Sequence, residues 1–167
     1  MEKVFGTEER HDSLIEHGTK KCVLIYGYGE ENGQGYDYRH VFDHIPTKEE
    51  VLAVIHKQVN DNTDQTILTS FVWNGKNVWL STENEFNFKA AYDLAVQFGG
   101  ANLPIKFKLG EDAEGKPVYH TFESMEEFTD FYTKAIAFVN TALNIGWAEK
   151  DAATEWVNTL NLNSVEV

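Results

Sequence analysis

The sequence predicts an α+β protein, in which antiparallel β-hairpins alternate with three main helices and a short C-terminal helix. Two observations lead to this class. Three helix-start signals, each a Ser or Thr followed three residues later by Glu, precede apolar stripes at helical spacing. Between them lie pairs of strand-like runs joined by short turns, whereas a parallel sheet would need a helix between every two strands.

The helix starts share one chemistry, because the hydroxyl and the carboxylate can each accept a hydrogen bond from a free amide of the first turn. They are Thr47 with Glu50, Thr82 with Glu85, and Ser124 with Glu127. The third helix is predicted to be the longest, with its apolar face formed by Phe128, Phe131, Tyr132, Ala135, Val139, Ala142 and Leu143. Helix stops are expected at Gly99 and Gly146, followed by a short helix at 149–160.

The strongest hairpin signal is the aromatic run 71–80, which contains an Asn-Gly turn. A two-residue loop would pair Trp73 with Lys76, and a four-residue loop would pair Trp73 with Val78. We predict the second register, because it places apolar side chains opposite one another throughout. A second hairpin is expected from 103–109 to 117–122 across an acidic turn.

Residues 1–46 are predicted to form an N-terminal strand pair or arm, and residues 47–160 an α+β domain. The strands of the pair are expected at 22–26 and 36–42. Segment 27–35 between them holds four glycines and is interpreted as a loose hairpin loop.

The chain has a formal net charge of −13, so phosphate backbones and anionic lipids would be repelled over most of its surface. Lys106 and Lys108 are the densest basic pair, and they alternate on a predicted strand with no aromatic platform beside them. We therefore expect neither nucleic acid nor a membrane as a partner. Residues 1–21 are polar and no run approaches the roughly 18 residues of a membrane helix, so cytoplasmic synthesis is predicted.

Catalytic and cofactor motifs are absent from the sequence, so no enzyme activity and no cofactor are predicted. The glycine-rich segment 27–33 follows an apolar run, but a phosphate-binding loop would need a helix start directly after it. Cys22 lies in an apolar run and is expected to be a buried thiol. The 27 Asp and Glu residues leave room for a carboxylate pair of the glycosidase type, which is a weak signal.

No metal site is predicted either. His40 and His44 are the closest histidine pair, but in an extended segment they would lie roughly 13 Å apart. The acidic clusters 61–64 and 111–115 lack the ligand pattern of a calcium loop and are interpreted as turns. His56 and His120 have no ligand-spaced partner.

The aromatic content of 13% suggests an interaction surface, for which the candidate residues are Trp73, Trp79, Tyr119 and Trp147. These side chains could contact a partner protein, including a second copy of the chain, or stack on sugar rings. The alternative is that they brace a small core.

From about Val59 to Asp151 the chain resembles an uncharacterised domain family of bacterial, phage and prophage proteins, many of them tail-fibre or tail-associated. The matching stretches are NDNTD at 60–64, ILTSFVWNG at 67–75, VWLSTENEFNFKAAY at 78–92, YHTF at 119–122 and GWAEKD at 146–151. The resemblance implies a structural or interaction module of a tail-like assembly, and with it association with the virion, and carries no functional residues over. The alternative is a module that binds or cleaves carbohydrate at a cell surface.

Overall fold

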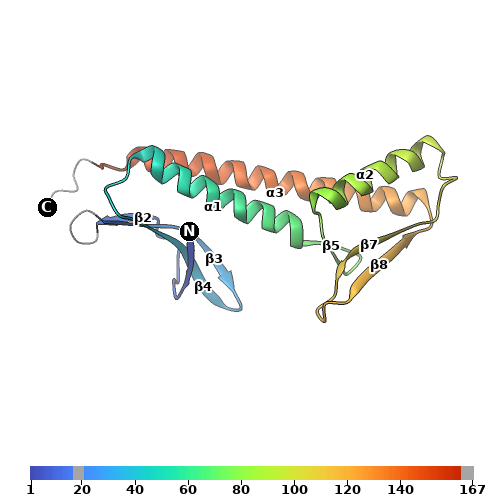
Figure 1. Ribbon diagram of the computed structural model, residues 1–167, viewed down its shortest axis with the longest axis horizontal. Helices are drawn as coiled ribbons and strands as arrows, with labels where there is room; N and C mark the ends of the chain where they lie inside the picture. Colours follow the sequence, from blue (N-terminus) through green and yellow to red (C-terminus); the bar gives the residue numbers. More distant parts are fainter. Residues whose placement is uncertain (17–20, 163–167) are drawn as a thin grey trace. The chain divides into compact units, whose positions relative to one another are not determined.

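The computed structural model describes residues 1–16 and 21–162, which form three helices and eight strands (Figure 1). The helices are α1 (Lys48–Thr69), α2 (Thr82–Gln97) and α3 (Met125–Thr159). Every strand pairing is antiparallel, so the predicted α+β class is confirmed. The described residues divide into two compact units, unit 1 from Met1–Asn60 and Trp147–Val167 and unit 2 from Asp61–Gly146. This division differs from the predicted one at 46/47.

Unit 1 contains a four-stranded sheet in the order β1-β4-β3-β2. Its strands are β1 (Glu2–Phe5), β2 (Ser13–Glu16), β3 (Cys22–Glu31) and β4 (Gln34–Phe42). The predicted strand pair is therefore present as β3 and β4, but two edge strands flank it. These edge strands lack a clear sequence pattern, because each is four residues long and none of their side chains is fully buried.

The prediction of a loose loop at 27–35 is wrong, because β3 and β4 continue to a tight turn at Asn32-Gly33. Both turn residues have positive φ, 52° and 76°, as a two-residue hairpin turn requires. Gly27 and Gly29 instead lie at a bulge of β3, where the register shifts between Tyr26 and Gly29.

The core of unit 1 lies between the sheet and the two helical segments that belong to the unit. Leu24 and Tyr26 of β3 pack with Val51 and Ile55 of α1 and with Val157 of α3. Cys22 is buried in the same cluster as a free thiol, as predicted, and burial raises its pKa.

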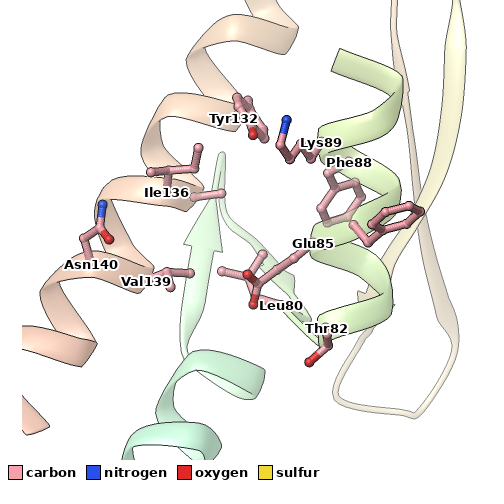
Figure 2. A pocket seen from close by; sticks show the side chains of 11 residues that line it. Leu80, Thr82, Glu85, Phe88, Lys89, Tyr132, Ile136, Val139 and Asn140 are labelled. Carbon is pink, nitrogen blue, oxygen red and sulfur yellow. The ribbon is translucent and has the colours of Figure 1, made fainter. Parts of the chain in front are cut away.

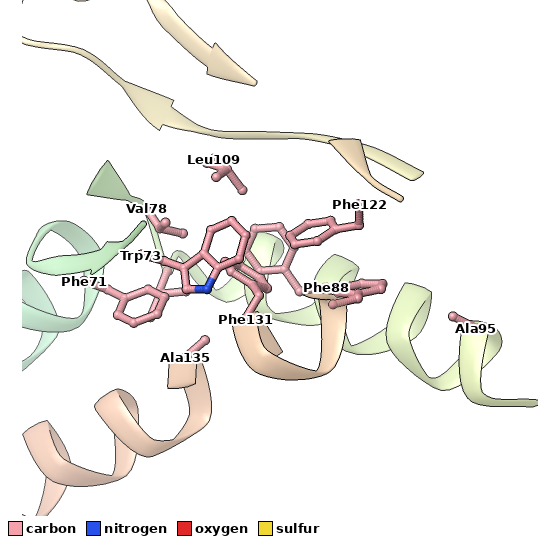
Figure 3. Close-up of a cluster of buried hydrophobic side chains, with 11 residues drawn as sticks. Phe71, Trp73, Val78, Phe88, Ala95, Leu109, Phe122, Phe131 and Ala135 are labelled. Atoms are coloured by element: carbon pink, nitrogen blue, oxygen red, sulfur yellow. The ribbon is translucent and has the colours of Figure 1, made fainter. Parts of the chain in front are cut away.

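Unit 2 contains two hairpins, β5 (Phe71–Trp73) with β6 (Lys76–Val78) and β7 (Ile105–Glu111) with β8 (Pro117–Phe122). They enclose an aromatic core with α2 and α3, in which Trp73, Phe122 and Phe131 have ring centroids 5.0 to 5.6 Å apart (Figure 3). The predicted apolar face of α3 supplies this core through Phe128, Phe131 and Ala135.

The predicted register of the first hairpin is wrong, because Trp73 pairs with Lys76 across a two-residue loop. Asn74 and Gly75 have φ of 48° and 72°, the left-handed conformation that tight hairpin turns need. The register of the hairpin is therefore set by the backbone conformation of the two turn residues, and not by the pairing of apolar side chains across the strands. The aromatic side chains find their contacts across the core with α3 and β8.

The helix starts are mostly as predicted. The Thr47 amide donates to Glu50 at 2.7 Å and the Glu50 amide donates to the Thr47 hydroxyl at 3.2 Å, which is a reciprocal capping box. The Glu127 amide donates to Ser124 at 3.2 Å. The second start is displaced by one residue, since Ser81 is the cap that accepts from the Asn84 amide.

Two predicted boundaries are wrong because polar or small residues lie inside helices. Segment 61–64 belongs to α1, where Asp61, Asn62 and Asp64 face outward. Gly146 is buried within α3, which continues through the predicted short C-terminal helix to Thr159. A Cβ atom at Gly146 would lie 2.5 Å from the Thr63 hydroxyl, so this glycine permits a close approach instead of a helix stop. The stop at Gly99 is confirmed, with φ of 58° directly after α2.

Candidate interaction site

Unit 2 contains an open apolar groove between α2 and α3, with a volume of about 490 Å³ (Figure 2). Its base contains Leu80 and Phe88, each 2% exposed, which also belong to the aromatic core. Its rim exposes apolar side chains, with Phe86 at 70% and Ile136 at 44%. The groove therefore opens the edge of the core to solvent.

The two helical walls present residues at intervals of three and four. The α2 wall consists of Thr82, Glu85, Phe86 and Lys89, and the α3 wall of Tyr132, Ala135, Ile136, Val139 and Asn140. This is the spacing at which side chains share one helix face and pack against another helix. Tyr132, Ala135 and Val139 of this wall belong to the apolar stripe predicted from the sequence, whereas Ile136 lies beside that stripe and was not part of it.

Glu85 is the one carboxylate in the groove lining, and its side chain points from α2 into the space between the helices (Figure 2). Burial raises its pKa. Within the described residues, the Glu85 carboxylate has neither a hydrogen bond nor an ion pair, although its backbone amide donates to the carbonyl of Ser81 in the first turn of the helix. An acid that is predicted to cap a helix thus lies in an apolar groove instead.

Lys89 is the one basic side chain in the groove lining, and its charge is already matched. Its ammonium group donates to Asp93 at 2.5 Å, one turn further along α2. The Asp93 carboxylate raises the pKa of Lys89 through this hydrogen bond. The unmatched charge of the groove is therefore negative and belongs to Glu85.

The four aromatic residues proposed from the sequence as an interaction surface do not form a common surface. Trp73 is 2% exposed and its indole NH donates to Asp130 at 3.0 Å, so it belongs to the core. Trp79 is half-buried, whereas Tyr119 and Trp147 are 52% and 56% exposed. Trp147 lies in unit 1 and the other three in unit 2.

The expectation that Lys106 and Lys108 have no aromatic neighbour is wrong. The Lys106 ammonium lies 4.6 Å from the Tyr119 ring centre and that of Lys108 lies 5.4 Å from the Trp79 ring centre. Tyr119 is directly opposite Lys108 in the strand pairing, so the contact of Lys106 with Tyr119 is a diagonal one, two residues along β7. Each of these two rings therefore has a cation of the same chain at cation–π distance.

His120 lies in a half-buried polar network of unit 2 that local sequence spacing did not reveal. Its Nδ1 is 2.9 Å from the Lys76 ammonium and its Nε2 is 2.9 Å from the Glu127 carboxylate. The ammonium can only donate, so Nδ1 accepts and Nε2 donates to Glu127. The network cross-links β6, β8 and the start of α3, and both ring nitrogens are already occupied.

Unit 1 has a comparable network around Glu149 of α3. Arg10 donates to Glu149 at 2.7 Å and the Tyr26 hydroxyl donates at 2.8 Å. Burial raises the pKa of Glu149, but the hydrogen bonds from Arg10 and Tyr26 outweigh it, and the net pKa is lowered. This carboxylate is therefore fully paired.

Among residues 1–16 and 21–162, no group of three or more His, Cys, Asp or Glu side chains could hold a metal ion. His44 contacts Asp43 and Glu50 at 2.8 and 3.2 Å, so its nearest acids are the neighbouring residue and the capping glutamate of α1. The turn expected at 111–115 is present, with Asp112 accepting from the amides of Glu114 and Lys116.

Comparison with protein-family models, with curated proteins and with solved structures gave no match to this chain. The resemblance from Val59 to Asp151 therefore stays a prediction. No helix in the described part of the chain combines the length and the apolar character needed to cross a membrane.

Proposed function

We propose that this chain is a non-enzymatic structural or interaction module of a phage or prophage tail-like assembly. The observation that carries the proposal is the α2–α3 groove, whose rim exposes Phe86 and Ile136 beside the core of unit 2. Exposed apolar side chains gathered in a groove are typical of a surface that another protein covers.

The reactive side chains of the chain support a structural role. His120 is held between Lys76 and Glu127, and Cys22 is a buried thiol whose pKa is raised. A nucleophile needs the opposite environment, with a lowered pKa and access to substrate. The tail context comes from the resemblance of segment 59–151 alone.

The proposal is tested by expressing an epitope-tagged chain in a lysogen and purifying induced particles on a density gradient. The tagged chain should sediment with particles and with isolated tails, and deletion of its gene should reduce the number of infectious particles. A tagged chain that stays in the soluble fraction while tails form normally would contradict the tail assignment.

A further inference from the structure

We propose that the α2–α3 groove binds an amphipathic α-helix of a partner protein, and that a Lys or Arg of this helix pairs with Glu85. The inference deepens the proposed function and rests on it, because it names the partner of the same surface.

The shape of the groove favours a helix. Lining residues recur at intervals of three and four along both walls, over 82–89 of α2 and 132–140 of α3. Side chains of a third helix would enter the gaps between them, as knobs enter holes in a coiled coil. Binding of an amphipathic helix in such a groove is a common mode of protein recognition.

The lining fixes the apolar face of the partner helix. Leu80, Phe88 and Ala135 are nearly buried at the base, and Phe86 and Ile136 remain exposed at the rim. Leu-type side chains of the partner would cover the base, while the Phe86 ring would close over one side. Apolar burial supplies the affinity of such an interface.

The charge of the groove fixes the polar character of the partner. Glu85 has a partly buried carboxylate without a partner among the described residues, and Lys89 is already paired with Asp93. A cation that enters the groove would restore the lost solvation of Glu85 and lower its raised pKa. An acidic side chain at the same place would be repelled.

A second copy of this chain is a less suitable occupant. Unit 2 carries 12 acidic and 6 basic residues, and the whole chain has a net charge of −13. Two copies would therefore repel each other as they approach. Helix α2 itself would bring Glu83, Glu85 and Asp93 against a groove that already holds an unpaired acid.

The test uses two capped, fluorescent peptides of about three heptads, with Leu at positions a and d in both. One carries Lys at positions e and g and the other carries Glu. Fluorescence anisotropy with the full chain should show the Lys peptide bound at least about tenfold more tightly than the Glu peptide. Equal binding of the two peptides would overturn the proposal.

Matched variants separate the groove from general charge attraction. Glu85→Gln should weaken the Lys peptide about tenfold, whereas Glu126→Gln, at an exposed acid of α3 outside the groove lining, should change it less than about twofold. Ile136→Asp should abolish binding, and Ile145→Asp, at a more exposed isoleucine of the same helix outside the groove lining, should not. Circular dichroism of each variant checks that it is folded.

Other outcomes of these measurements would overturn the groove proposal or the tail context. Equal losses in Glu85→Gln and Glu126→Gln, or wild-type binding by a folded Ile136→Asp, would overturn the proposal. Self-association that depends on concentration and is lost only in Ile136→Asp would assign the groove to a second copy and overturn it as well. If neither peptide binds but the chain still sediments with tails, only the groove proposal is contradicted. If the peptides bind but the chain is absent from tails, only the tail context fails.

Discussion

Glu149 in unit 1 and Glu85 in unit 2 are both partly buried carboxylates of helices, but their surroundings differ. Glu149 accepts hydrogen bonds from Arg10 and Tyr26, and its pKa is lowered. Glu85 lies in an apolar groove without a partner among the described residues, and its pKa is raised. The Glu149 carboxylate is therefore paired within the chain, whereas the Glu85 carboxylate is available to a partner molecule.

The largest effect on stability is expected in the core of unit 2, where the apolar face of α3 is buried. Phe131→Ala removes a fully buried ring from the aromatic core and should lower the free energy of unfolding by about 3–5 kcal/mol. Ile136→Ala, on the open groove side of the same helix, should change it by less than about 1 kcal/mol. Urea denaturation of both variants measures the contrast, and a wild-type midpoint in Phe131→Ala would show that this face is not buried.

The next effect concerns the paired carboxylate. Glu149→Gln removes the charge that Arg10 and Tyr26 stabilise and should lower the free energy of unfolding by about 1–2 kcal/mol at neutral pH. Glu8→Gln, at an exposed glutamate of unit 1, provides the matched control and should have almost no effect. Similar denaturation midpoints for the two variants would mean that the network contributes nothing to stability.

A smaller effect is expected at Gly146, where α3 approaches Thr63. Gly146→Ala favours the helix but places its Cβ against the Thr63 hydroxyl, so a net loss of about 1 kcal/mol is expected. Thr63→Ala should relieve this clash. A double-mutant cycle measures the coupling, and strictly additive changes would show that the two residues do not meet.

The smallest effect is a difference in pH dependence between the two carboxylates. The folded pKa of Glu149 is lowered, so its contribution is present at neutral pH and is lost as the pH falls through that pKa, below the ordinary value of 4.5. The folded pKa of Glu85 is raised, so its contribution is present in acid and is lost as the pH rises above 4.5.

Glu85→Gln should therefore stabilise the chain at neutral pH by less than about 1 kcal/mol, because the carboxyl is only partly buried, and should have no such advantage in acid. Glu149→Gln should instead destabilise the chain at neutral pH. Denaturation curves at both pH values give the comparison, and destabilisation by Glu85→Gln at neutral pH would indicate a partner for Glu85 within the chain.

Local signals predicted much of the fold. The capping pairs at Thr47 and Ser124 and the stripe from Phe128 are short-range patterns, and the structure contains them. Gly146 was misassigned because a glycine within a helix and a glycine at a helix stop differ only in what packs against them. Here that neighbour is Thr63, which is far away in the sequence.

The candidate site was harder to predict than the fold. Its residue type makes Trp73 a candidate for a surface, yet strand pairing directs it into the core. The spacing from Thr82 predicts a capping role for Glu85, but its place in the groove depends on how α2 packs against α3. Such placements depend on tertiary contacts, and no spacing within the sequence encodes them.

The most direct test of the central claim is site-specific photo-crosslinking from the groove during particle assembly. Benzoylphenylalanine at Phe86 should give an adduct with another protein, and its crosslinked peptide should be a basic amphipathic helix. The same group at Ile145, an exposed position outside the groove lining, should give no such adduct. Adducts only between copies of this chain, or equal adducts from both positions, would contradict the assignment of the groove to a partner helix.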